Sequence, residues 1–101
     1  MRTSIVGRQM EITDAIQRHA EQKVTKLEKY EDQVIRCDFT VGKESPSKEL
    51  FRAELLVAVR NHAEIVAKAE GHDLYVLIDE VIAKAGRQLH DLKEKLKLEN
   101  R

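Results

Sequence analysis

The chain contains no tryptophan, two tyrosines, two phenylalanines, one proline and one cysteine in 101 residues. With so few aromatic rings, stacking on bases cannot dominate any recognition of nucleic acid. The single thiol, Cys37, has no second cysteine for an internal disulfide, which is typical of the reducing cytoplasm. No apolar run reaches the roughly 20 residues of a membrane span, and the amino-terminal MRTSIVGRQM lacks a signal-peptide core. We therefore expect a cytoplasmic protein with no membrane partner.

An excess of charge of one sign is also absent, because 18 Lys and Arg balance 18 Asp and Glu. This neutral total argues against nucleic-acid binding, for which a basic excess is expected. The charges are nevertheless polarised along the chain. From Lys84 to the end there are six basic and three acidic residues, whereas acids outnumber bases between Glu28 and Glu54. A local basic face can therefore exist on a molecule with no net charge.

Short runs with apolar residues at alternate positions predict strands at 3–6, 34–41, 50–59 and 63–69. The second run is expected to direct four side chains into the core: Ile35, Cys37, Phe39 and Val41. In the fourth run Ala63 is expected to begin the inward face. The segment 42–49, GKESPSKE, predicts a loop. A turn is expected at 60–62, and without glycine its hairpin loop is expected to exceed two residues.

Two amphipathic helices are predicted. Thr13 is the expected N-cap of the first, which runs to about Tyr30, and Asp73 is the expected cap of the second, which runs to Lys97. The apolar stripe of the second helix is Leu74, Ile78, Val81, Ile82, Ala85, Leu89, Leu92 and Leu96. The order β-α-β-β-β-α predicts an α+β two-layer sandwich, a four-stranded sheet with both helices packed on one face. We expect one domain at 1–97 and a short tail at 98–101.

Patterns that indicate catalysis or metal binding are absent from the sequence. There is no phosphate loop and no GxGxxG, and none of the four histidines pairs with another histidine or with the cysteine at metal-ligand spacing. Cys37 is expected to face the core, where a buried thiol is inert. We therefore expect no enzyme activity, no metal and no cofactor.

Basic residues border the apolar stripes of both predicted helices. On a helical wheel Arg18, Lys26 and Lys29 lie opposite the buried stripe of the first helix. In the second helix Lys84, Arg87 and Lys95 lie on one flank of the stripe, and Lys93 and Lys97 lie on the other. One interpretation is a solvated face with i,i+4 ion pairs. The other is a joint basic surface that contacts RNA phosphates without reading sequence.

Three segments together resemble the ribosome hibernation promoting factor and ribosome-associated inhibitor family. They are IVGRQMEITDAI, KLEKYED and AEGHDLYVLIDEVIAKAGRQLHDLKEKLK, in the family's order from Ile5 to Lys97. The parts most specific to the family are GHDLYVLID and the run Lys84-x-x-Arg87-Gln88-Leu89. The resemblance implies a β-α-β-β-β-α fold similar to double-stranded RNA-binding domains, which agrees with the order predicted above.

The resemblance also implies a function. Family members bind the small ribosomal subunit in the channel of messenger and transfer RNA, and they silence translation in stationary phase by occupying it. The basic residues of the two helices face ribosomal RNA. The positions that match the family motif are Lys23, Lys26, Lys84, Arg87, Gln88, Lys93 and Lys95. The wheel adds Arg18, Lys29 and Lys97.

Because the chain ends soon after the second helix, it resembles the short members of the family. Some short members help a ribosome modulation factor to form ribosome dimers, and others, with a longer tail, oppose dimers. The brief tail at 98–101 favours the dimer-promoting kind, and off the ribosome we expect a monomer. The alternative is a protein-interaction module that modulates a transcription factor through the acidic stretch from Glu28 to Glu54. Gly86 is unusual inside a predicted helix. It marks a close approach of RNA or of the other helix, or it is neutral variation.

Overall fold

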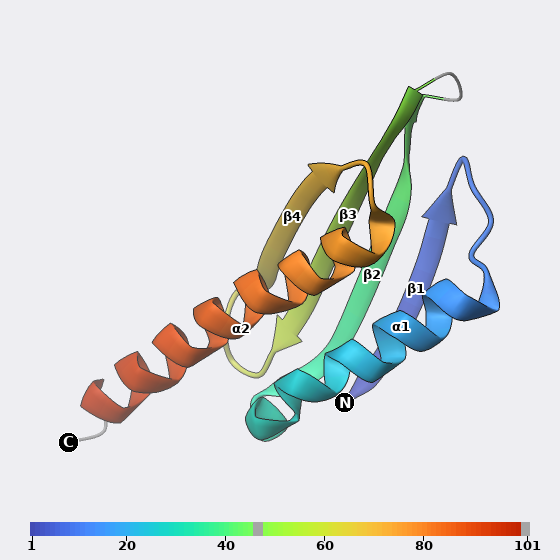
Figure 1. Ribbon diagram of the computed structural model, residues 1–101. Coiled ribbons are helices and arrows are strands. Elements are labelled where there is room, and N and C mark those ends of the chain that lie inside the picture. The colour runs from blue at the N-terminus through green and yellow to red at the C-terminus, as the bar shows by residue number, and fades with distance from the viewer. Residues whose placement is uncertain (46–47, 100–101) are drawn as a thin grey trace.

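The computed structural model describes residues 1–45 and 48–99, and it has a sheet layer and a helix layer (Figure 1). The elements in chain order are strand β1 (Arg2–Arg8), helix α1 (Asp14–Val24), the 3₁₀ helix η1 (Thr25–Tyr30), strands β2 (Val34–Ser45), β3 (Lys48–Val59) and β4 (Ile65–Gly71), and helix α2 (Leu74–Glu99). The predicted order and the α+β sandwich are confirmed.

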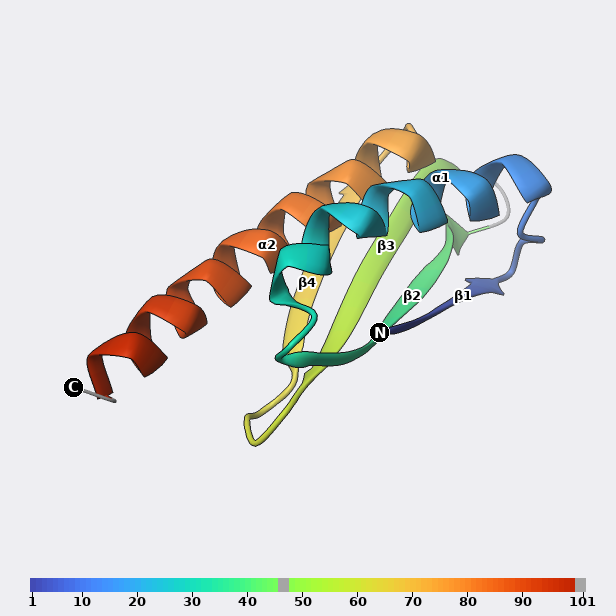
Figure 2. The ribbon, with the colours of Figure 1, turned by 90° about the horizontal axis from the view of Figure 1, so that it is seen from below.

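The four strands form one sheet in the order β1-β2-β3-β4. β1 runs parallel to β2, whereas β2, β3 and β4 are antiparallel to their neighbours. Figure 2 shows both helices over the same face of the sheet, so its other face is open. Phe39, Leu55 and Ile78 are each 0% exposed between the two layers. The core therefore lies between the inner face of the sheet and the apolar stripes of α1 and α2.

Side-chain caps fix the beginnings of both helices, as predicted. The Ile16 N–H donates to Thr13 Oγ1 at 3.1 Å, and the Tyr75 N–H donates to Asp73 Oδ1 at 3.0 Å. The predicted stripe of α2 is buried as far as Leu92, and Leu77, which lies outside that stripe, is buried with it. Leu96 is 37% exposed because the carboxyl-terminal turns of α2 extend past the sheet (Figure 1).

The sequence predicted one regular helix running to about Tyr30, and this prediction is wrong. Its α-helical part ends at Val24, and a 3₁₀ helix continues to Tyr30. The change occurs at Thr25, whose hydroxyl donates to the Gln22 carbonyl at 2.6 Å. Such a local side-chain bond competes with regular α-helical pairing. A 3₁₀ helix has three residues per turn instead of 3.6. A wheel drawn at 100° per residue therefore gives the wrong directions for the side chains of residues 25–30.

The prediction that Ile35 faces the core is wrong. Ile35 is 41% exposed, whereas the preceding Val34 is 1% exposed. The register explains the difference, because Val34 pairs with Val59 and Arg36 pairs with the adjacent Ala58, so Ile35 is an extra residue in β2. Such a bulge shifts the inside–outside alternation by one position. Beyond it, Cys37, Phe39 and Val41 are buried as predicted.

The ends of several elements also differ from the predictions. Strands β2 and β3 extend into the predicted loop at 42–49, of which residues 46–47 lie outside the described residues. The connection from β3 to β4 spans 60–64, longer than two residues as expected, with Asn61 in the left-handed region at φ 55°. β4 therefore begins at Ile65 and leaves Ala63 exposed. α2 includes residues 98–99 of the predicted tail, while 100–101 lie outside the described residues.

Candidate nucleic-acid interface

α1 and α2 lie side by side and run in the same direction, as both ribbon views show (Figures 1 and 2). Asp79 of α2 connects them. Its Oδ1 lies 2.9 Å from His19 Nε2 and 3.9 Å from Lys23 Nζ, both on α1. The His19 ring meets the Tyr75 ring edge-on, with their centroids 5.0 Å apart. Lys23, a predicted RNA contact, therefore has a carboxylate partner between the helices.

Further along, a hollow of about 400 Å³ separates η1 from α2. Four of its lining residues carry basic side chains: Lys26 and Lys29 from η1, and Arg87 and His90 from α2. Gly86 and Leu27 contribute to its apolar lining. The structure thus brings together, around one hollow, predicted basic residues that are 58 to 61 positions apart in the sequence.

The Tyr30 ring lies near two amines at the same junction, those of Lys29 and Lys93. Lys29 Nζ lies 5.4 Å from the ring centroid and Lys93 Nζ lies 5.9 Å from it. Both distances are within the range of cation–π attraction. Tyr30 is 4% exposed, so its position is fixed by the core. Lys93 of α2 and Lys29 of η1 therefore lie around one ring, and the predicted cations of the two helical segments meet here a second time.

A second hollow, of about 790 Å³, lies on the other side of α2 against β4. Lys84, Arg87 and Gln88 line it together with Lys68. Lys84 Nζ donates to the Lys68 carbonyl at 2.7 Å, and Gln88 Nε2 donates to the Val66 carbonyl at 3.2 Å. Arg87 lines both hollows, so it connects the η1 side of α2 with the β4 side.

Other predicted residues do not join these hollows. Arg18 lines a separate hollow with three more residues of α1: Asp14, Gln17 and Glu21. Its predicted grouping with Lys26 and Lys29 is wrong because the 3₁₀ winding of η1 directs those two lysines toward α2. Lys97 pairs with Glu94 at 3.6 Å, and Lys95 is exposed on the carboxyl-terminal part of α2.

The structure adds two residues that neither the wheel nor the motif indicated. His90 lines the η1 hollow and Lys68 lines the β4 hollow. His90 follows Arg87 by three positions, a spacing that places both near one helical face, so a wheel that included histidine would have found it. Lys68 had no sequence signal, because its place beside α2 follows from the pairing of β4.

Gly86 is not required by the packing of the two helices. A Cβ atom added there would meet Leu27 Cδ2 at 3.6 Å, which is an ordinary van der Waals contact. A close approach of η1 therefore does not explain the glycine. Of the three interpretations, an approach of RNA and neutral variation are the two that the packing leaves open.

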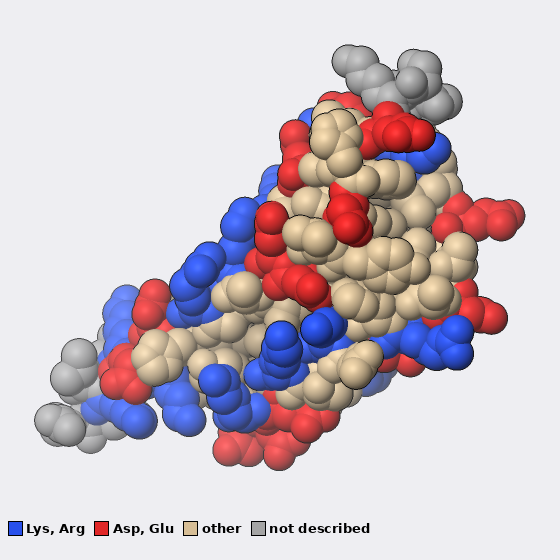
Figure 3. Space-filling model, in the orientation of Figure 1, with Lys and Arg blue, Asp and Glu red and all other residues tan. Residues whose placement is uncertain are grey.

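Figure 3 shows the charge pattern of the helical face. Lys and Arg gather on both sides of α2 along its carboxyl-terminal half and near η1, where a group of Asp and Glu lies at the lower edge of the view. Asp and Glu predominate around the first turns of α2. The neutral total charge thus conceals one end of the helical face that is mainly basic. Such local charge can attract a polyanion even when the whole molecule carries no net charge.

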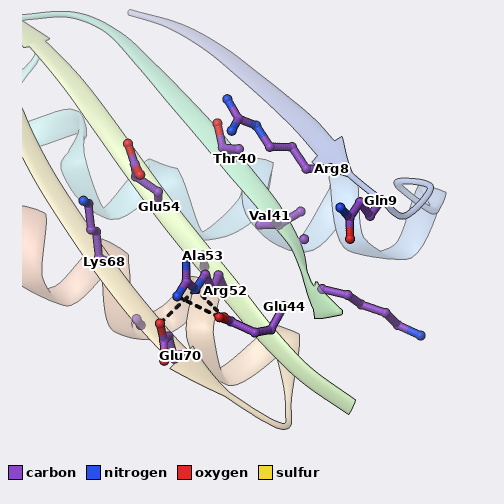
Figure 4. Close-up of a pocket in the computed structure, with 13 residues that line it drawn as sticks. Arg8, Gln9, Thr40, Val41, Glu44, Arg52, Ala53, Glu54, Lys68 and Glu70 are labelled. Carbon is purple, nitrogen blue, oxygen red and sulfur yellow. Dashed lines mark hydrogen bonds and ion pairs between the residues drawn. The ribbon is translucent and has the colours of Figure 1, made fainter. Parts of the chain in front are cut away.

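The open face of the sheet carries a different pattern. A hollow of about 460 Å³ lies there, and its cations Arg8, Lys43, Arg52 and Lys68 alternate with Glu44, Glu54 and Glu70. Figure 4 shows Arg52 between two of these acids; it donates to Glu44 at 2.9 Å, and its Nε lies 2.9 Å from Glu70. Because acids balance the cations, this face has no basic excess and differs from the helical face.

Nothing in the described part of the chain resembles a reactive centre. Burial raises the pKa of Cys37 to about 11, so its thiol is uncharged at neutral pH and is no nucleophile. Among residues 1–45 and 48–99, no three His, Cys, Asp or Glu side chains are placed to hold a metal ion. No helix in these ranges is both long and apolar enough to cross a membrane.

Together these features define a small α+β sandwich whose helical layer carries a basic end. Residues 3–97 match the family described as Sigma 54 modulation protein / S30EA ribosomal protein, and the chain belongs to this family. It is 39% identical over 97 residues to the ribosome hibernation promoting factor of Escherichia coli K12, covering 96% of this chain and 98% of that protein.

Two further comparisons agree with this family. The ribosome hibernation promoting factor of Azotobacter vinelandii is 37% identical over 97 residues, which cover 94% of this chain and 85% of the relative. The crystal structure of the Thermus thermophilus Protein Y N-terminal domain superposes with a TM-score of 0.79 at 27% identity, covering 91% of this chain and 99% of that one. The family expected from the sequence is thereby confirmed, and so is its fold.

Proposed function

We propose that this protein is a ribosome hibernation factor that binds the small ribosomal subunit through the basic end of its helical layer. The observation that carries the proposal is the position of Arg87. It lines the η1 hollow with Lys26 and Lys29, and it lines the β4 hollow with Lys84. Cations from two separate helical segments thus form one strip across α2. Membership of the family supports the ribosome as the partner.

The chemistry of this strip suits an RNA backbone. Lys and Arg donate to phosphate oxygens, and such contacts position a protein on RNA without reading its sequence. Structured RNA is recognised largely by shape and by phosphate and 2′-hydroxyl groups. This mode of recognition fits a protein with only four aromatic residues, because it does not depend on stacking against bases. The 26-residue α2 is about 39 Å long, so its contacts can extend over several nucleotides.

The proposed mechanism is occupancy, with no chemical step. The domain, residues 1–97, lies in the channel of messenger and transfer RNA and thereby silences translation in stationary-phase cytoplasm. With a ribosome modulation factor it promotes dimers of silenced ribosomes. The names of the relatives support hibernation as the outcome, and the long shape of the molecule, 54 × 21 × 19 Å, supports occupancy of a channel.

The first test is the triple variant Lys26→Ala, Lys84→Ala and Arg87→Ala. It removes cations from both hollows, so we expect most of the protein to leave purified small subunits in a sedimentation assay. Each lost phosphate contact should also reduce the slope of log affinity against log salt concentration by roughly 0.7–0.9. The slope is measured by repeating the sedimentation over a range of KCl concentrations.

The matched control removes the same charge from the open face of the sheet. Arg8→Ala, Lys43→Ala and Arg52→Ala all change cations that line the hollow of Figure 4. We expect this variant to sediment with small subunits as wild type does, with an unchanged salt slope. If both variants bind equally, the strip across α2 is not the binding surface. A wild-type protein found only in the light fractions of a stationary-phase lysate would reject ribosome binding itself.

A further inference from the structure

The outer edge of β4 is occupied by side chains of α2. In the described part of the sheet β4 pairs with β3 alone, so its other edge is free. The carbonyls of Val66 and Lys68 face this edge. They accept hydrogen bonds from Gln88 Nε2 at 3.2 Å and from Lys84 Nζ at 2.7 Å, respectively. Without these two side-chain donors the edge would present carbonyls that no strand pairs, and such an edge is a template for pairing with another strand.

The match between helix and strand is geometric. Residues 66 and 68 are two apart, so along the strand their carbonyls are about 6.6–6.8 Å apart. Lys84 and Gln88 are four apart, which is a rise of about 6 Å along the helix. One turn of α2 therefore supplies two donors at the spacing of two successive outward carbonyls. These are the same acceptors that an added antiparallel strand would use.

The sequence of β4 is complementary to itself in one register. If two β4 strands pair antiparallel about Ala69, Lys68 of each lies opposite Glu70 of the other. The carbonyls of Val66 and Lys68 point away from β3 toward α2. Backbone groups of every second residue in a strand point the same way, so residues 68 and 70 both direct their N–H and C=O groups outward. The register therefore gives main-chain hydrogen bonds as well as two cross-strand pairs of opposite charge, which are favourable.

The other edge of the sheet does not offer the corresponding match. β1 is the outer strand on that side and carries Arg2 and Arg8 at its two ends. Antiparallel pairing of two β1 strands about Ile5 would place Arg2 of one copy opposite Arg8 of the other, and like charges directly opposite are unfavourable. Charge thus protects β1, whereas β4 depends on the side chains that cover it.

We propose that Lys84 and Gln88 keep the free edge of β4 closed to a second copy of this chain, and that without them two copies join by antiparallel pairing of β4. This role goes beyond the proposed RNA contact of the two residues. It concerns the protein alone and is measured without ribosomes, so its failure and the failure of the proposed function are separate results.

The test is the double variant Lys84→Ala, Gln88→Ala, studied by sedimentation equilibrium. Both side chains are at least partly exposed and alanine has the highest helix propensity, so the fold is retained, which circular dichroism verifies. We expect wild type to stay at the 11.6 kDa mass of one chain and the variant to shift toward twice that mass. Its self-association constant should rise at least about tenfold.

The matched control is Lys95→Ala, Gln22→Ala, which makes the same two changes at exposed positions of the two helices. We expect this control to stay at the mass of one chain. If Lys84→Ala, Gln88→Ala also stays at that mass, the proposal is overturned.

The register is tested by charge. Adding Glu70→Lys to the double variant places lysine opposite lysine and should return it to one chain, whereas adding Lys68→Glu together with Glu70→Lys restores opposite charges and should restore the dimer. If the self-association constant is the same with and without these charge changes, the proposed pairing of β4 about Ala69 is wrong.

Discussion

Asp38 lies on the open face of the sheet, where two side chains hold its carboxylate. Arg36 Nε donates to Oδ2 at 2.8 Å, and the Ser4 hydroxyl donates to Oδ1 at 2.8 Å. Burial alone would raise the pKa of Asp38. The hydrogen bonds from Arg36 and Ser4, together with the positive charges of Arg36 and Arg2, outweigh burial, so the pKa is lowered. The folded state therefore favours the ionised carboxyl.

This pKa predicts a pH-dependent contribution to stability. A carboxyl with a lowered pKa stabilises the fold above its unfolded pKa, about 3.9, and loses that effect as the pH falls through the folded value. We therefore expect Asp38→Asn to be less stable than wild type at pH 7, with the difference shrinking below about pH 4. Urea unfolding across this range measures it. A difference that stays constant with pH would show that Asp38 acts through packing instead.

Within α2, Gly86 lowers the stability of the helix, and the packing around it does not require a glycine. Glycine in a helix interior costs roughly 0.5–1 kcal/mol relative to alanine, because it loses more backbone freedom on folding. The site has room for a methyl group, since the nearest side-chain atom would lie 3.6 Å from the new Cβ. Gly86 therefore lowers the stability of the helix without any requirement from the packing of the free protein.

Gly86→Ala should consequently stabilise the protein. We expect the free energy of unfolding to rise by about 0.5–1 kcal/mol, measured by urea denaturation at constant slope. The reverse change at a nearby exposed helical position, Ala83→Gly, is the control and should lower it by a similar amount. A destabilised Gly86→Ala would mean that Leu27 cannot accept the added methyl group.

At the scale of the whole molecule, α2 is longer than the sheet that it covers. Leu92 is 8% exposed and is the last residue of the stripe in the core, whereas Leu96 is 37% exposed beyond it. Figure 1 shows this end of α2 past the edge of the strands, and the molecule measures 54 Å along its long axis. The end of α2 thus has little tertiary packing, on which most helical stability depends.

We therefore expect unequal protection along α2 in hydrogen exchange. Opening free energies range from near zero at fraying ends to the global value in the core. Amides at 95–97 should exchange at least about a hundredfold faster than those at 81–89, as measured by NMR or mass spectrometry. Equal protection in the protein without RNA would contradict this description and would indicate that another contact covers the end of the helix.

The element order and most of the core follow from the sequence alone, because apolar periodicity is a local pattern. Thr13, Asp73 and the stripe from Leu74 to Leu92 could be predicted from neighbouring residues alone. Alternation could not reveal the extra residue Ile35, because a bulge exists only relative to a partner strand. The family motif indicated which basic residues to expect in an RNA-binding surface, but it did not predict which residues lie beside them in the fold.

The distribution of those cations over separate surfaces depends on the packing of distant segments. The 3₁₀ winding of η1 directs Lys26 and Lys29 toward α2 and separates them from Arg18. The pairing of β4 at the edge of the sheet gives Lys84 and Gln88 main-chain partners. Both results depend on helix position and strand pairing between distant segments. A periodic pattern records which side of an element is buried, and it does not record what lies beside that element.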